Sequence, residues 1–181
     1  MTDRIAPLFG LIRSTLDQLE REVTFVSPIP PQQPTSRDRW LLWPSAFEPK
    51  YLVSPFGAER KTFTHEGLDI RAPDGTEVYA CADGVVDLLY IGKFYGDCVR
   101  ILHDRPEADY QTYYAHLKYW KVTQGQVIKQ GQVIGLADNT GNSSGAHLHL
   151  TLVEIGKRTK LRGISLVGCI DPMPHMIDPP T

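Results

Sequence analysis

The first 26 residues carry apolar side chains at a helical spacing. They fall three or four positions apart, at Ile5, Leu8, Ile12, Leu16, Leu19 and Val23, which places them on one face of an α-helix. Polar residues fill the other face, so residues 1–26 are predicted to form an N-terminal amphipathic α-helix. Residues 27–36 then hold four prolines, which exclude a helix or a central strand. Residues 27–48 are therefore predicted to be a linker and lead-in.

The pattern changes to short β-branched segments after residue 49. These segments cover residues 77–82, 84–91, 98–103, 112–116, 126–128, 132–136 and 147–155. Turn residues separate many of them at short, regular intervals, as in antiparallel sheets. Gly125 and Gly131 each open a turn before a Val-Ile pair, which is typical of a hairpin. Residues 49–178 are predicted to form one mainly β domain built on an antiparallel sheet.

Composition and charge narrow the range of partners. Hydrophobic residues make up 41% and charged residues 22% of the 181 residues, an ordinary globular balance. The formal net charge of −2 gives no electrostatic field for binding nucleic acid or an anionic membrane. No apolar run approaches the roughly 20 residues that span a bilayer.

The N-terminal sequence does not look like a secretory signal peptide. An acidic residue, Asp3, stands where such peptides are basic, and Pro7, Gly10 and Arg13 interrupt the apolar stretch. The sequence therefore leaves three expectations open: a cytosolic protein, export by another route, or a missing leader.

The three cysteines are predicted to be small buried side chains. Cys81, Cys98 and Cys169 form no C-x-x-C pair, which argues against a thiolate zinc site. Their odd number argues against a full disulfide framework.

Residues 140–150, TGNSSGAHLHL, match two kinds of catalytic signature. Gly141, Ser143 and Gly145 fit the G-x-S-x-G pattern of serine hydrolases, which needs a helix after the serine. Here Leu148 and Leu150 alternate with polar residues, as in a strand. We therefore interpret Gly141, Ser143 and Gly145 as turn residues.

A further alternative is a carrier domain with a modified Lys129, or a purely structural β domain. This alternative predicts that the protein binds no metal.

The histidines are better candidates for a metal site. His147 and His149 are two residues apart, so on a strand they point to the same side. His65 and Asp69 are four apart, about 13 Å on a straight strand, and reach one ion only if the chain bends, which Gly67 permits. The spacing alone does not separate a ligand pair from solvated histidines, and it does not distinguish the role of His147 from that of His149.

The sequence contains several motifs that resemble, in kind and in order, those of the lysostaphin-type peptidases of the M23 family. These are zinc endopeptidases of peptidoglycan. Three motifs carry the chemistry: His65-x-x-x-Asp69, Tyr114-Ala115-His116-Leu117 and His147-Leu148-His149. Flanking matches are Ser54-Pro55-Phe56-Gly57, Ala82-Asp83-Gly84-Val85-Val86, Tyr95-Gly96 and Gly131-Gln132-Val133-Ile134-Gly135. The likeness covers about residues 51–155. Ser144, Ala146 and the Leu150-Thr151 pair depart from the usual family residues, at positions that bear on the wall of the cleft and so on substrate choice.

The resemblance implies one Zn²⁺ ion held by His65, Asp69 and His149, with His116 and His147 as catalytic residues. It further implies a hydrolase of the metalloprotease type that cuts peptide cross-links of the bacterial cell wall. The alternative is a non-catalytic module of the same fold that binds and activates another wall hydrolase. The substrate implies an extracytoplasmic location at the cell wall, as for an exported enzyme or a phage lysin. His103 matches a family histidine without a catalytic role, and we interpret it as structural.

Overall fold

The computed structural model describes residues 38–157, 159–161, 164–166 and 168–180. The helix predicted over residues 1–26 and the proline-rich segment 27–36 lie outside the described residues. Within the described ranges, no helix has the length and hydrophobicity that a membrane crossing requires.

Antiparallel strands account for nearly all regular structure in the described part of the chain. They are β1 (Leu52–Ser54), β2 (Leu68–Ile70), β3 (Glu77–Tyr79), β4 (Gly84–Gly92), β5 (Gly96–Asp104), β6 (Asp109–Trp120), β7 (Val127–Ile128), β8 (Val133–Ala137), β9 (Leu148–Glu154), β10 (Thr159–Leu161), β11 (Ile164–Leu166) and β12 (Cys169–Ile170). A 3₁₀ turn, η1 (Met173–His175), follows them. The predicted antiparallel β fold is confirmed, and each of the seven predicted segments contains a strand.

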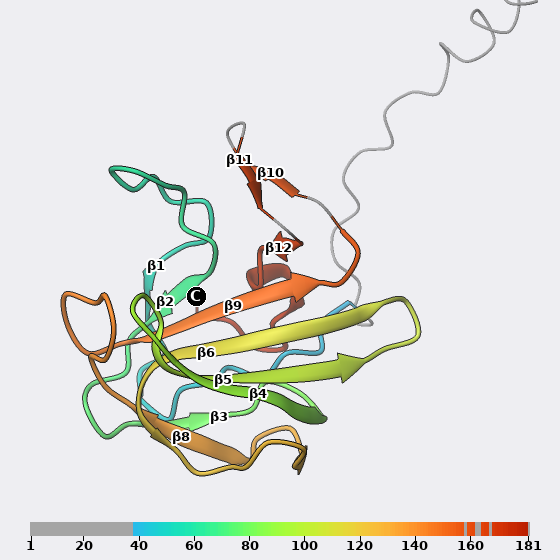
Figure 1. Cartoon of the computed structure of the whole chain (residues 1–181), viewed down its shortest axis with the longest axis horizontal. Helices are drawn as coiled ribbons and strands as arrows, with labels where there is room; N and C mark the ends of the chain where they lie inside the picture. Colours follow the sequence, from blue (N-terminus) through green and yellow to red (C-terminus); the bar gives the residue numbers. More distant parts are fainter. Residues whose placement is uncertain (1–37, 158, 162–163, 167, 181) are drawn as a thin grey trace, which may run out of the picture. The chain divides into compact units, whose positions relative to one another are not determined.

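Ten of the strands belong to one sheet. Its order is β1-β2-β9-β6-β5-β4-β7, with β12 also paired to β9, and β8 paired to both β3 and β6. The long strands β4, β5, β6 and β9 lie side by side in Figure 1. Strands β10 and β11 form a separate hairpin. Strand β9 therefore stands between β2 and β6, and it brings the segments around residues 69, 115 and 149 together.

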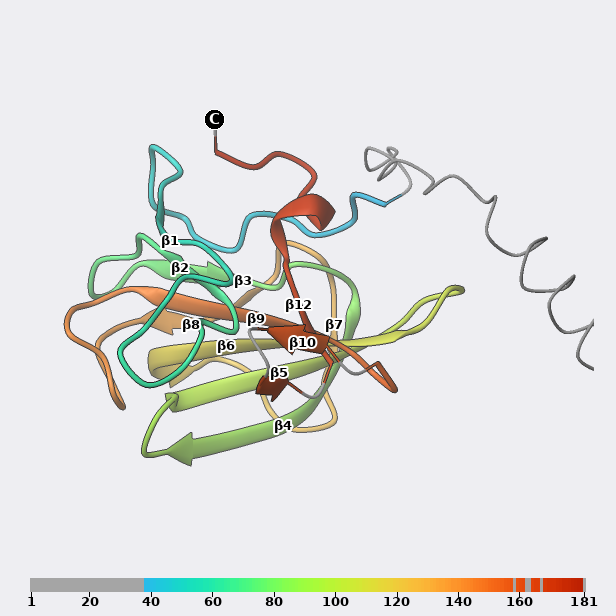
Figure 2. The ribbon, with the colours of Figure 1, turned by 90° about the horizontal axis from the view of Figure 1, so that it is seen from above.

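The core lies on one side of β9 and takes in the lead-in segment. Leu148, Leu150 and Leu152 are fully buried, as their alternation predicts. Residues before β1 contribute Trp40, Leu41 and Trp43 to the same buried cluster. Leu41 forms a parallel bridge with Met176, so the described residues before β1 lie beside the C-terminal segment, as Figure 2 shows. Residues 40–43 are thus part of the folded unit.

The cysteines behave as predicted, since Cys81, Cys98 and Cys169 are free and buried. His103 is also buried, at 1% exposure. Its Nδ1 donates to the Asp83 carbonyl over 2.7 Å, and its Nε2 lies 2.7 Å from Thr112 Oγ1. Burial lowers the pKa of His103, so this histidine is a neutral link between β5, β6 and the turn before β4.

Candidate metal centre

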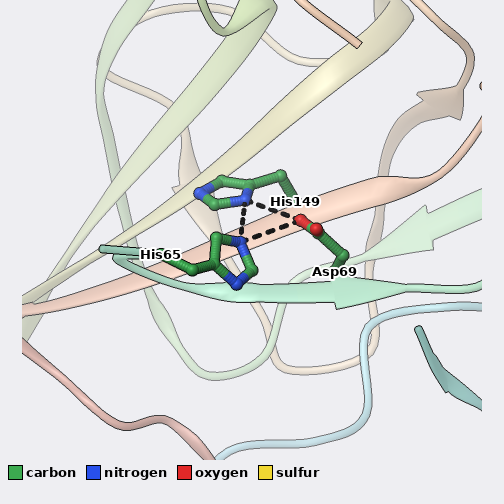
Figure 3. Close-up of side chains that lie close together, drawn as sticks. All are labelled: His65, Asp69 and His149. Atoms are coloured by element: carbon green, nitrogen blue, oxygen red, sulfur yellow. Dashed lines mark hydrogen bonds and ion pairs between the residues drawn. The ribbon is translucent and has the colours of Figure 1, made fainter. Parts of the chain in front are cut away.

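Two neighbouring strands bring an aspartate and a histidine face to face. Asp69 on β2 pairs directly with His149 on β9, and His65 lies just before β2. The His65 Nε2 atom lies 3.0 Å from Asp69 Oδ1 and 3.1 Å from His149 Nδ1. His149 Nδ1 and Asp69 Oδ1 are 2.9 Å apart. Figure 3 shows the three side chains converging on one point.

The close approach of β2 to β9 depends on Gly67. A Cβ atom at this position would lie 2.4 Å from the Leu150 carbonyl oxygen and 2.9 Å from the His149 ring. The φ angle of Gly67 is not positive, so the backbone conformation at this position does not require glycine. The predicted bend between His65 and Asp69 is present, but the reason for glycine here is space.

Hydrogen bonds outside the cluster orient each donor atom. The Nδ1 of His65 donates to the Pro55 carbonyl over 2.8 Å. A carbonyl only accepts, so the proton stays on Nδ1 and the lone pair of neutral His65 is on Nε2. His149 Nε2 lies 2.9 Å from Thr151 Oγ1, which leaves its Nδ1 for the centre. Asp69 Oδ2 accepts from Arg60 Nη2 over 2.6 Å, and its Oδ1 faces the histidines.

This donor set fits a zinc ion. Zinc binds imidazole nitrogen and carboxylate oxygen at about 2.0–2.2 Å in a tetrahedron, whose corners are then roughly 3.3–3.6 Å apart. The three donor atoms are 2.9–3.1 Å apart, which is close to that spacing. Each of the three side chains also has an outer hydrogen bond of the kind that zinc sites use to fix ligand orientation.

His116 reaches the same centre through an irregularity in β6. From the pair Val99–Tyr114 to the pair Asp97–Leu117, β5 moves by two residues and β6 by three. The extra length places His116 at φ 61°, the only positive φ among the described residues other than glycine. At this bulge β6 stops pairing with β9 and begins to pair with β8. The bulge directs the imidazole away from the regular alternation of the strand.

His116 and His147 form a second pair beside the first three residues. Their ring centroids are 4.8 Å apart, and His147 Nε2 lies 3.4 Å from Asp69 Oδ1. His116 Nδ1 donates to the Thr140 carbonyl over 2.7 Å, and His147 Nδ1 donates to the Gly145 carbonyl over 2.8 Å. Both rings therefore carry the Nε2 lone pair when neutral, and the Nε2 of His147 points into the centre.

The two rings differ in their electrostatic surroundings. Burial lowers the pKa of His116 to about 4, so this ring is neutral at neutral pH. Burial also opposes the charged form of His147, but the hydrogen bond and negative charge of Asp69 outweigh it and raise the His147 pKa. The pKa of Asp69 itself is held well below its ordinary value: burial opposes ionisation, but the interactions of its carboxylate with His147, His149 and His65 outweigh that effect.

The five residues open onto a cleft of about 950 Å³. The residues that line it include Arg60, Phe63 and Glu66 from the arm before β2, and Tyr90, Phe94 and Tyr95 from β4 and the turn after it. The Tyr95 hydroxyl donates to Glu66 and so links these two segments. The Tyr95 ring also stacks on His149, with centroids 5.5 Å apart.

All five residues selected from the sequence lie together, whereas the serine motif serves a turn. Ser143 Oγ donates to the Gly145 carbonyl over 2.8 Å, and a strand, not a helix, follows the turn. Sequence reasoning gave no role to Arg60, Tyr95 or Thr151. Tyr95 stood in a motif of the family resemblance, and Thr151 lies two residues beyond His149 on the same side of a strand. The place of Arg60 depends on a loop path that no spacing encodes.

Known proteins resemble this chain in both sequence and fold. The model of peptidase family M23 matches residues 63–161. Over 113 residues the chain is 37% identical to the peptidoglycan DD-endopeptidase ShyA of Vibrio cholerae, covering 62% of this chain and 25% of the relative. A zinc-containing peptidase from Vibrio cholerae superposes with a TM-score of 0.60 at 26% identity, covering 78% of this chain and 41% of that chain.

The catalytic domain of lysostaphin from Staphylococcus simulans has the same fold. It superposes with a TM-score of 0.58 at 23% identity, and the match covers 69% of this chain and 90% of that domain. The chain spans about a quarter of the length of the curated relatives it matches.

Proposed function

The chain belongs to peptidase family M23, and we propose that it is a zinc-dependent endopeptidase that hydrolyses peptide cross-links of bacterial peptidoglycan. The observation that carries this proposal is the convergence of His65 Nε2, Asp69 Oδ1 and His149 Nδ1 within 3.1 Å of one another. Two further imidazoles beside them and an open cleft supply what a hydrolase needs besides a metal.

We assign the metal to His65, Asp69 and His149. Two neutral imidazoles and one carboxylate would leave a net charge of +1 and a fourth position for water, as in catalytic zinc sites. When bound, zinc supplies a Lewis acid that polarises a carbonyl and lowers the pKa of a bound water to about 7.

His116 and His147 are the proposed proton-transfer residues. The chain has no complete H-E-x-x-H motif, and Glu66, which follows His65, accepts a hydrogen bond from the Tyr95 hydroxyl, so we assign the transfer of protons between water and the leaving amine to other groups. Both rings have Nδ1 tied to a backbone carbonyl, which leaves Nε2 to accept a proton from water or, once protonated, to donate one. One ring would assist water attack, and the other would stabilise the oxyanion or protonate the leaving nitrogen.

The proposed substrate follows from the family and from the relatives. ShyA is named a peptidoglycan DD-endopeptidase, which supports a cell-wall peptide as the substrate of this chain. Peptidoglycan lies outside the cytoplasmic membrane, so the proposed place of action is extracytoplasmic.

Digestion of purified peptidoglycan tests this function. The zinc-loaded protein should release free amino groups from the wall, and a chelator should stop the release until zinc is added back. His147→Ala should keep its zinc but lose activity by about 10²-fold or more, the usual effect of losing a proton-transfer group. Bound zinc without cleavage of any wall type would contradict the proposal and favour a regulatory module.

A further inference from the structure

Arg60 is a cation fixed at the mouth of the cleft, beside the metal centre. It lies on the arm before β2, where its backbone N–H donates to the Phe63 carbonyl over 2.9 Å and the neighbouring residues Glu59 and Thr64 form a bridge. Its side chain is 35% exposed and lines the cleft. The arm is therefore an ordered turn that presents the guanidinium to whatever enters.

Only part of the guanidinium is used inside the protein. Nη2 donates to Asp69 Oδ2 over 2.6 Å and to Ser54 Oγ over 3.1 Å. Within the described residues, the hydrogen bonds of this side chain all leave from Nη2. Arginine has five N–H donors in a planar fork, so the N–H groups of Nε and Nη1 are left for a ligand.

Arg60 is the point of the cleft lining where an anionic group would meet a permanent positive charge. Arg60 is the only lysine or arginine among the described residues that line the cleft. Of the two acidic groups there, Asp69 already bonds Nη2, and Glu66 accepts from the Tyr95 hydroxyl. Guanidinium binds carboxylate through two parallel hydrogen bonds more readily than it binds neutral groups.

We propose that Arg60 binds a free carboxylate of the substrate, located on the α-carbon that carries the leaving amine. This inference rests on the proposed peptidase function and specifies its substrate class. Two covalent bonds of about 1.5 Å separate the leaving nitrogen from the carboxyl carbon. Arg60 lies one hydrogen bond beyond Asp69 Oδ2, so a peptide that reacts at the metal centre brings this carboxylate next to the fork.

The preferred substrate is then an amide bond whose leaving residue keeps its α-carboxylate. Peptide ends and cross-links between two D-amino acids meet this condition when the carboxyl group on the α-carbon that carries the leaving amine is free. A bridge of neutral glycine residues offers no carboxylate there and is expected to be a poor substrate.

Two synthetic peptides test the proposal. Each contains an amide bond from D-alanine to a second D-amino acid, whose α-carboxyl group is free in one peptide and converted to a carboxamide in the other. The wild-type protein should cleave the free acid with a kcat/KM about 10- to 100-fold higher, as expected for charge-assisted hydrogen bonds. In Arg60→Gln this preference should disappear.

Three variants distinguish recognition of the substrate carboxylate by Arg60 from a purely structural role of this residue. If Arg60 only holds Asp69 in place, Arg60→Gln will slow both peptides equally and leave their ratio unchanged, which would overturn the proposal. Lys61→Gln removes the same charge from the next, exposed residue of the arm, and it should keep the wild-type ratio. Arg60→Lys should restore part of the preference through charge alone.

Calorimetry of both peptides with metal-free protein gives a readout that does not need cleavage. The free acid should bind about tenfold or more tightly than the carboxamide to wild type, and equally to Arg60→Gln. Equal binding to wild type would overturn the proposal even if both peptides were cleaved. Selective binding without cleavage would support the role of Arg60 and contradict the proposed peptidase function.

Discussion

At the residue scale, the site depends on single atoms that are fixed from outside it. Three of its four histidines donate Nδ1 to a backbone carbonyl, those of Pro55, Thr140 and Gly145. A carbonyl cannot donate, so the tautomers are set before any ligand binds. Preorganised donors avoid the cost of reorientation when charge develops in the transition state.

Gly67 offers a test of how tightly this arrangement is packed. Gly67→Ala places a methyl group within 2.4 Å of the Leu150 carbonyl oxygen and against the His149 ring. We expect a loss of about 1–3 kcal/mol in the free energy of unfolding, as for other overpacked sites, together with weaker zinc binding. Urea denaturation and a zinc titration measure the two effects.

Gly145→Ala is the matched control for this change. Nothing lies within 4 Å of a Cβ at Gly145, so both quantities should stay near their wild-type values. A Gly67→Ala protein with unchanged stability and zinc affinity would contradict the packing argument.

At the level of the strands, the sequence predicted where they form but not where their pairing becomes irregular. Alternation predicted that Leu148 and Leu150 point to the core and that His147 and His149 share a side, and both side chains reach Asp69. The bulge at His116 leaves no trace in the pattern, because it arises where β6 changes partners. The proposal that His149, and not His147, binds the metal came from family resemblance, since spacing did not distinguish the two.

The bulge predicts an unusual order of stability at position 116. A left-handed conformation costs residues other than glycine roughly 1–2 kcal/mol, so His116→Gly should be more stable than His116→Ala by about 1 kcal/mol. Both variants lack the imidazole, and neither should be active. Chemical denaturation in the presence of a chelator compares them without a contribution from metal.

Glycine should have the opposite effect on stability one residue earlier, at Ala115. It lies in regular pairing with His149, so Ala115→Gly should cost stability, as glycine usually does inside a strand. If alanine were at least as stable as glycine at position 116, the positive φ would not be a strained feature of the fold.

At the scale of the whole molecule, the folded unit includes residues that composition assigned to a lead-in. Prolines dominate residues 27–36, and nothing in the sequence separates them sharply from the apolar residues that follow. Trp40, Leu41 and Trp43 are nevertheless buried in the core, and Leu41 exchanges backbone hydrogen bonds with the segment around Met176. We therefore propose that the domain begins before Trp40.

Truncation tests this boundary. A fragment of residues 38–181 should unfold cooperatively, whereas a fragment of residues 49–181 loses three large core side chains. Each large-to-small change in a core costs about 2–5 kcal/mol, so the shorter fragment should be severely destabilised or unfolded. Leu41→Ala in the full chain should lower the free energy of unfolding by the amount expected for one such change. Equal denaturation midpoints for the two fragments would place the boundary after residue 48.

We propose that His65, Asp69 and His149 bind the metal, and that His116 and His147 do not. The most direct test is the zinc content of purified variants after dialysis against a low concentration of free zinc, measured by elemental mass spectrometry. Alanine at His65, Asp69 or His149 should remove most of the zinc, while His116→Ala and His147→Ala should retain about one ion per chain. A His147→Ala protein without zinc, beside a His149→Ala protein that keeps it, would contradict the account.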